Sequence, residues 1–181
     1  RNAAGASNST RFLMAGGYVS SASNIIDYVQ INTLGNALDF GDLRISKYYP
    51  AGIPSPIRAV FAGGTTPGNT ETMSFVKFAS KGNAVNFGEL SSGGGTFQSG
   101  GASDGVRGVL AGTYNPTATY INNIEYLTIA SEGNTTHFGS LTVGRSASGS
   151  SGGTRGIFAG GSTGSYTNTI DFIQIATTGN A

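Results

Sequence analysis

The chain of 181 residues has no cysteine, no tryptophan, a single histidine and few charged residues. The absence of cysteine excludes a disulfide framework and thiolate metal sites. Charged residues make up 10% of the sequence, whereas ordinary domains have about 25%. The ten Lys and Arg residues are scattered and the net charge is +1, so no basic cluster is present that could bind nucleic acid.

Long apolar runs are missing as well, and none approaches the 18 residues that a membrane-spanning helix requires. Glycine is abundant, with 30 residues, yet 38% of the chain is apolar and these residues occur in short, regular bursts. A disordered Gly/Ser linker would lack such bursts, because it could not bury enough apolar surface to offset the entropy of the chain. The length is that of one folded domain with its own core.

The bursts belong to an internal repeat that begins at Arg11, Arg58, Arg107 and Arg155. These arginines are 47, 49 and 48 residues apart in turn, and a period of that size is typical of repeat architectures. The sequence therefore predicts a single region, residues 1–181, built from units at 11–57, 58–106, 107–154 and 155–181. The last unit is short, and we expect residues 1–10, or chain outside this sequence, to complete it. Because Ala181 falls in mid-repeat, we expect a segment of a longer chain.

Each unit contains the pattern of four short strands. The arginine begins a run of four β-favouring residues that ends at glycine, such as Gly156–Ala159 before Gly160. After a polar loop, a second strand alternates polar and apolar residues, as in Ile170–Ile175, and a Gly-Asn pair typical of hairpin turns follows it. A Phe-Gly pair predicts a third strand, and the polar return to the next arginine a fourth. No window has helical spacing of apolar residues, so we predict an all-β fold of four-stranded antiparallel blades.

The unit resembles the kelch repeat, in which a strand ends in Gly-Gly, an acid precedes an aromatic, a hairpin leads to an aromatic and a leucine, and an arginine with a downstream glycine begins the closing strand. The matching places are held by Ala159-Gly160-Gly161, Asp171-Phe172, Phe138 with Leu141, and Arg145 with Gly149. The family's tryptophan is a phenylalanine here, Ser74 replaces the acid in one unit, and Lys47 and Gly94 replace the arginine in two. The resemblance implies a β-propeller. The residue pattern of the repeats is also similar to that of tandem arrays in appendage proteins of tailed phages.

Two arrangements of the four units remain open at this point. The four blades could close into a small ring, or they could be part of a larger propeller or array, since kelch-type rings usually have six or seven blades. In either arrangement a single unit cannot bury both faces of its sheet, so neighbouring blades must supply the remaining burial.

Charged residues recur at two places in the unit. The arginines at 11, 58, 107 and 155 are expected to be structural, bonding either a neighbour's carbonyl groups or the recurrent acid. Asp27, Glu125 and Asp171 share a second place, and because they lie on separate blades we expect backbone bonding rather than the paired carboxylates of a glycosidase. His137 without cysteine cannot assemble a zinc site or a catalytic triad. We therefore predict no catalytic, metal or cofactor-binding residues and no enzyme activity.

Tyrosine marks the most variable loops, those that follow the Gly-Gly strand. Tyr18, Tyr114, Tyr120 and Tyr166 stand there among Asn, Ser and Thr, and a further pair, Tyr48-Tyr49, lies on a different loop. Tyrosine offers rigid apolar area and one hydroxyl, a combination common on surfaces that recognise sugars or proteins. The four loop tyrosines are the predicted ligand contacts.

These observations favour a structural and recognition module, extracellular or on a virion such as a tail fibre, that contacts a host protein or glycan or a neighbouring subunit. The alternative is a cytoplasmic scaffold of the kelch type for protein interaction. Neither requires a cofactor, nucleic acid or membrane insertion, and either could form a homo-oligomer.

Overall fold

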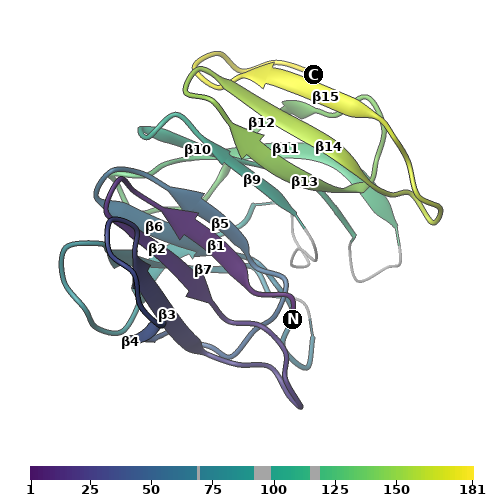
Figure 1. The fold of residues 1–181 in the computed structure, drawn as a ribbon. Coiled ribbons are helices and arrows are strands. Elements are labelled where there is room, and N and C mark those ends of the chain that lie inside the picture. The colour runs from purple at the N-terminus through teal and green to yellow at the C-terminus, as the bar shows by residue number, and fades with distance from the viewer. Residues whose placement is uncertain (69, 92–98, 115–118) are drawn as a thin grey trace.

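The computed structural model describes residues 1–68, 70–91, 99–114 and 119–181, and these fold into four antiparallel sheets without a helix (Figure 1). The sheets are blades of a β-propeller-like arrangement, which confirms the predicted all-β fold of four units. Blade 1 contains β1 (Ala4–Ser7), β2 (Arg11–Ala15), β3 (Ile25–Gln30) and β4 (Leu38–Asp42). Blade 2 contains β5 (Ala51–Pro54), β6 (Arg58–Ala62), β7 (Thr72–Lys77) and β8 (Val85–Glu89). Blade 3 contains β9 (Gly100–Ser103), β10 (Arg107–Tyr114), β11 (Tyr120–Thr128) and β12 (Thr136–Ser140), and blade 4 contains β13 (Ser146–Ser151), β14 (Arg155–Ser162) and β15 (Ile170–Gln174).

The boundary of each blade differs by one strand from the boundary of the sequence repeat. The polar strand before each arginine pairs with the strand that starts at that arginine, as Ala4 to Ser7 pair with Ala15 to Phe12. Residues 1–10 therefore begin blade 1 and do not complete the unit 155–181. The reason is local: Asn8 Oδ1 accepts hydrogen bonds from the N–H groups of Thr10 (2.9 Å) and Arg11 (2.8 Å), which closes a tight turn between β1 and β2.

The apolar core lies between blades rather than within them. Alternation in each strand gives every sheet two faces, which we call the leading face, toward the preceding blade, and the trailing face, toward the following blade. Leu13 and Ile26 on the trailing face of blade 1 belong to one buried cluster with Phe61 and Phe78 on the leading face of blade 2. Two further clusters join blades 2 and 3 and blades 3 and 4 in the same way. Each blade is thus stabilised mainly by its neighbours.

The Gly-Asn pairs, expected as hairpin turns, also connect the blades. The N–H of Gly82 donates to the carbonyl of Phe40 (2.8 Å), and Asn83 Oδ1 accepts from the N–H of Asp42 (3.1 Å). The same backbone bond joins Gly133 to Phe87 (2.7 Å) and Gly179 to Phe138 (3.0 Å). Each of these three pairs therefore attaches the outer edge of its blade to the outermost strand of the blade before it.

The four blades form an open arc, because the leading face of blade 1 and the trailing face of blade 4 do not pack on each other. Met14 on the first of these faces is 50% exposed and Ile170 on the second is 69% exposed. Figure 1 shows the two end sheets separated across the arc. Of the two arrangements considered from the sequence, the closed four-bladed ring is not the one observed in the described residues.

Candidate functional site

The loops that carry the candidate tyrosines gather at one end of the arc. The innermost strand of every blade, β1, β5, β9 or β13, starts at this end, and the strand beside it runs antiparallel and finishes there. The polar loop that follows each Gly-Gly position must therefore leave from the same end. We call this end the tyrosine rim and define it by Tyr18, Tyr48, Tyr49, Tyr114, Tyr120 and Tyr166.

Three of the tyrosines form a cluster at blades 1 and 2. The ring of Tyr18 lies edge-on to that of Tyr48, with centroids 5.2 Å apart, and Tyr48 lies 5.5 Å from Tyr49. Backbone bonds fix the cluster, because the N–H of Tyr49 donates to Asn2 (2.7 Å) and that of Tyr18 to Arg1 (2.7 Å). The sequence places Tyr18 and Tyr48 on different loops, and the structure brings them together.

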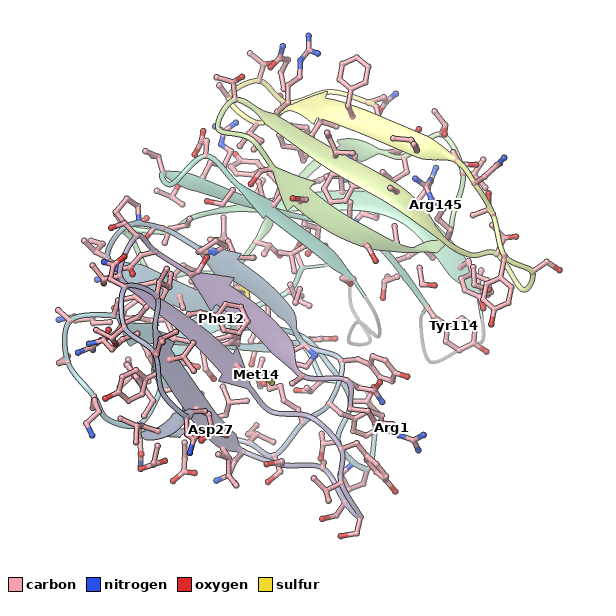
Figure 2. The ribbon with its side chains drawn as sticks, viewed as in Figure 1. Arg1, Phe12, Met14, Asp27, Tyr114 and Arg145 are labelled. Atoms are coloured by element: carbon pink, nitrogen blue, oxygen red, sulfur yellow. The ribbon has the colours of Figure 1, made fainter. Side chains whose placement is uncertain are left out.

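A second group lies at blades 3 and 4. Tyr114 and Tyr120 face each other at the ends of β10 and β11, with ring centroids 4.9 Å apart. The hydroxyl of Tyr120 lies 3.2 Å from Ser162 Oγ on the last blade. Tyr166 is 98% exposed at the tip of its loop. Figure 2 shows Tyr114 at the end of the arc where Arg1 also lies.

A cavity of about 790 Å³ opens between the two groups, on the axis of the arc. Its wall consists of the innermost strands of all four blades, and Tyr49 and Tyr166 stand at its edge. The wall residues are Gly, Ala, Ser, Pro and Thr, and none of the described residues that line the cavity is charged. Such a surface offers backbone amides, hydroxyls and aromatic faces, which suits a neutral polyhydroxylated or peptide ligand better than an ionic one.

The arginines that begin the repeat units lie at the other end of the blades, and three of the four bond to the neighbouring blade. The guanidinium of Arg58 donates to the carbonyls of Ile129 (3.2 Å) and Ala130 (3.1 Å) on the next blade. Arg107 makes the same two bonds one blade later, and Arg11 donates to the carbonyl of Phe78. Each guanidinium also lies over an aromatic ring of its own blade, as Arg155 lies over Phe172 at 5.0 Å. Arg11, Arg58 and Arg107 therefore bond to carbonyls of the next blade and not to the recurrent acids.

The three acids at the second recurrent place have different surroundings. Asp171 is buried and forms an ion pair of 2.8 Å with the fully buried Arg145. Burial alone would raise the pKa of Asp171, but hydrogen bonds from Arg145 and Thr142 outweigh it and hold the pKa below its usual value. Glu125 is also buried and accepts bonds from neutral groups, among them Thr135 Oγ1 at 2.7 Å. Asp27 is exposed.

Lys47 occupies in blade 2 the place that Arg145 has in blade 4, and it is fully buried. The acid of that blade is replaced by Ser74, so the ammonium bonds to the carbonyl of Thr72 (2.9 Å) instead of a carboxylate. Burial, together with the charge of Arg44, lowers the pKa of Lys47 to about 8. The third equivalent position, Gly94, lies outside the described residues.

The buried Lys47 predicts an alkaline rise in stability. Because its pKa is about 8 when folded and 10.5 in the reference state, the unfolded chain binds more protons between these values. The free energy of unfolding should therefore increase with pH through this window, by about 3 kcal/mol at its end. Lys47→Met should lack the rise, so the difference between variant and wild type changes with pH. Urea unfolding at pH 7, 8, 9 and 10 measures this, and parallel curves for the two proteins would contradict it.

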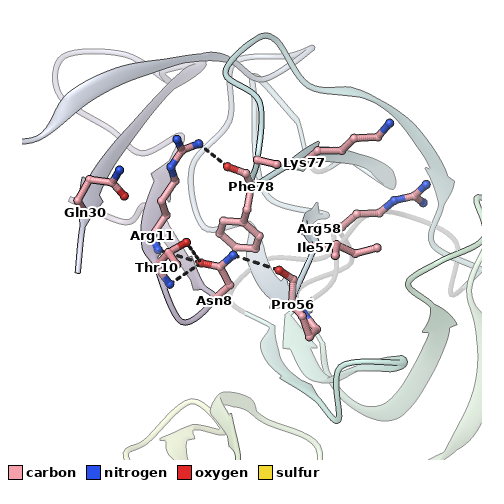
Figure 3. A pocket seen from close by; sticks show the side chains of 10 residues that line it. Asn8, Thr10, Arg11, Gln30, Pro56, Ile57, Arg58, Lys77 and Phe78 are labelled. Atoms are coloured by element: carbon pink, nitrogen blue, oxygen red, sulfur yellow. Dashed lines mark hydrogen bonds between the residues drawn. The ribbon is translucent and has the colours of Figure 1, made fainter. Parts of the chain in front are cut away.

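A second cavity, of about 510 Å³, lies at the end of the arc opposite the tyrosines, between blades 1 and 2 (Figure 3). Asn8 Nδ2 donates a hydrogen bond to the carbonyl of Pro56 (3.0 Å) at this cavity, and Phe78 and Ile57 form its apolar walls. Arg11 and Arg58 line it, but their guanidinium groups already bond to the carbonyls described above. These two guanidinium groups are therefore not free to bind an anion, and Lys77, which also lines the cavity, is the exposed cation there.

The remaining sequence candidates add no further cluster. His137 is exposed, and its Nδ1 lies 2.6 Å from Asn123 Oδ1. In the described part of the chain, no three His, Cys, Asp or Glu residues lie close enough together to hold a metal ion. Likewise, the described residues include no helix that is long and apolar enough to cross a membrane.

No protein-family model matches the chain, and no curated protein does either. The fold and the positions of the tyrosines, rather than relatives, therefore carry the functional argument. The structure brings Tyr18 near Tyr48, pairs Tyr114 with Tyr120, and leaves Tyr166 exposed beside the axial cavity. The sequence places Arg145 and Lys47 at the same position of the repeat unit, but it did not predict that both side chains are fully buried.

Proposed function

We propose that the chain is a non-enzymatic recognition module, with kelch-like blades, of an extracellular or virion appendage such as a tail fibre. Its ligand is a glycan or protein surface that docks on the tyrosine rim. One observation carries the proposal: tyrosines from loops far apart in sequence lie at the same end of the arc, and two of them, Tyr49 and Tyr166, stand at the edge of an uncharged axial cavity. Aromatic faces beside amides and hydroxyls are the chemistry that binds the apolar faces and hydroxyl groups of sugars.

The low charge supports the same proposal. An uncharged cavity wall gives little electrostatic attraction, so affinity must come from shape, stacking and hydrogen bonds. Single contacts of this kind are weak, and repeated contacts from an appendage with many copies would raise the overall avidity without new chemistry.

A glycan array tests the proposal with labelled wild-type protein and two variants. Tyr166→Ala removes an exposed ring, and a double variant, Tyr114→Ala with Tyr120→Ala, removes the pair of adjacent rings. We expect wild type to bind a defined subset of glycans and each variant to bind it at least about tenfold more weakly, because an aromatic contact is worth about 1.4 kcal/mol or more.

The matched control is Leu34→Ala, because Leu34 is fully exposed on the loop between β3 and β4, at the end of the arc opposite the rim. It should bind like wild type. Equal binding by wild type and the tyrosine variants, or no binding by any of them, would count against the rim as a glycan site.

A further inference from the structure

The leading face of blade 1 carries apolar residues at positions that are buried in every other blade. Met14 is 50% exposed, whereas its equivalents Phe61 and Phe158 are fully buried. Ile31 is 49% exposed, whereas its equivalents Ile129 and Ile175 are at most 1% exposed. Figure 2 shows Phe12, Met14 and Asp27 on this same sheet, at the near side of the arc. The leading face of blade 1 therefore has the residue types of a buried interface, although no part of the described chain covers it.

The trailing face of blade 4 also exposes apolar residues whose equivalents are buried in the other blades. Ile170 is 69% exposed, whereas Ile26, Met73 and Ile124 at the same place in blades 1 to 3 are all 0% exposed. Ile157 is 43% exposed, and Phe172, with Arg155 above its ring, is 55% exposed. These residues match in type the ones that form the trailing half of each internal interface.

The two exposed faces are the two halves of an interface that the chain already makes three times. In each internal interface, the apolar trailing face of one blade packs on the apolar leading face of the next blade. The repeat-starting arginine of the earlier blade donates to carbonyls of the later one. The carbonyls equivalent to those of Ile129 and Ala130 belong to Ile31 and Asn32 of blade 1. Arg155 is the one repeat-starting arginine that bonds to no such carbonyl within the described chain.

We propose that these faces join two copies of this chain head to tail. The trailing face of blade 4 in one copy, defined by Ile157, Ile170 and Phe172, packs on the leading face of blade 1 in another, defined by Phe12, Met14 and Ile31. Arg155 donates to the carbonyls of Ile31 and Asn32 of the second copy. The interface is heterologous, so it generates either a closed ring of arcs or a growing chain, according to the angle between copies.

The last blade sets a limit on the strength of this contact. Strand β15 has β14 as its one strand partner in the described chain, whereas β3, β7 and β11 each pair with an outermost strand as well. The Gly35-Asn36 turn of the second copy would therefore lack the outermost strand that Gly82 and Gly133 bond to in the internal interfaces. The association is expected to be reversible and dependent on concentration.

Sedimentation velocity over a wide concentration range tests the proposal. The wild type, 18.3 kDa per copy, should rise in weight-average mass to at least that of two copies. Met14→Asp and Ile170→Asp each place a charge in the apolar contact and should weaken association at least about tenfold. Val85→Asp is the matched control, because Val85 is 53% exposed on the outermost strand β8, outside both faces, and it should associate like wild type.

Mixing the two interface variants tests the head-to-tail geometry. Met14→Asp retains an intact blade 4 face and Ile170→Asp retains an intact blade 1 face, so an equimolar mixture should form dimers that neither variant forms alone. Thermal unfolding of each variant in dilute solution should match wild type to within a few degrees, which separates lost contact from lost folding. A wild type that stays a single copy at every concentration overturns the proposal. So does association that survives both substitutions, or a mixture that fails to associate.

Discussion

Replacing Asp171 by asparagine is expected to lower the free energy of unfolding by about 3–5 kcal/mol. Asp171 is the carboxylate that neutralises Arg145, whose side chain is fully buried and donates to Asp171 and to the carbonyls of Gly160 and Phe158. Asparagine keeps the shape of the side chain but leaves the guanidinium charge unpaired in the interior. The desolvation of that charge is then no longer compensated.

The pH dependence of the Asp171→Asn effect follows from the lowered pKa of Asp171. The stability that the carboxylate contributes is fully present above the unfolded pKa, about 3.9, and is lost as pH falls through the folded pKa. The cost of Asp171→Asn should therefore be largest near neutral pH and should shrink in strong acid. Urea unfolding at pH 7 and at pH 3 measures the change.

Asp27→Asn is the matched control, because Asp27 occupies the same place in the repeat but is exposed. In dilute solution it should change stability by less than about 0.5 kcal/mol. An apolar replacement of both partners, Arg145→Met with Asp171→Leu, should recover most of the loss, since neither charge then remains buried. A cost for Asp171→Asn as small as that of Asp27→Asn would show that the ion pair does not stabilise the blade.

Much of the fold could be predicted from the sequence because the same strand pattern occurs in each of the four repeat units. The run from Arg155 to Ala159 and the alternation in Ile170–Gln174 predict strands that the structure contains as β14 and β15. The period alone does not assign the polar strand before each arginine to a blade. That assignment depends on the short turn at Asn8, which forces β1 to pair with β2 rather than with a strand of another unit.

The candidate site was predictable in its composition but not in its geometry. Tyrosine in the variable loops could be recognised directly, whereas the contact between Tyr18 and Tyr48 depends on two blades lying side by side. The pairing of Asp171 with Arg145, rather than with one of the four repeat-starting arginines, could not be read from spacing. Arg155 lies over the ring of Phe172, whereas Asp171, the neighbouring residue on β15, points to the opposite face and meets Arg145.

The second large effect is expected at Gly52, where alanine should lower the free energy of unfolding by about 3 kcal/mol. A Cβ on Gly52 would lie 2.1 Å from the carbonyl oxygen of Gly5 on the innermost strand of blade 1. The obstacle is backbone rather than a flexible side chain, so β1 and β5 would have to separate. Overpacking of a core usually costs about 1–3 kcal/mol, and a backbone obstacle places this substitution at the upper end.

The same contact recurs along the axis, since a Cβ on Gly101 would lie 2.5 Å from the carbonyl oxygen of Gly52. Gly101→Ala should therefore destabilise as well. Gly152→Ala is the matched control, because its Cβ would meet nothing within 4 Å, and it should be neutral or stabilise by up to about 1 kcal/mol through the unfolded state. Thermal unfolding of the three variants ranks them.

The order of these effects also tests how the rim is positioned. The innermost strands that carry Gly52 and Gly101 form the wall of the axial cavity, and Tyr49 lies three residues before Gly52. If the glycines set the spacing of the blades, Gly52→Ala should weaken binding at the rim together with stability, whereas Gly152→Ala should change neither. Gly52→Ala with wild-type stability would mean that the blades can part without cost, and the close approach of glycine backbones would then not be what holds the arc together.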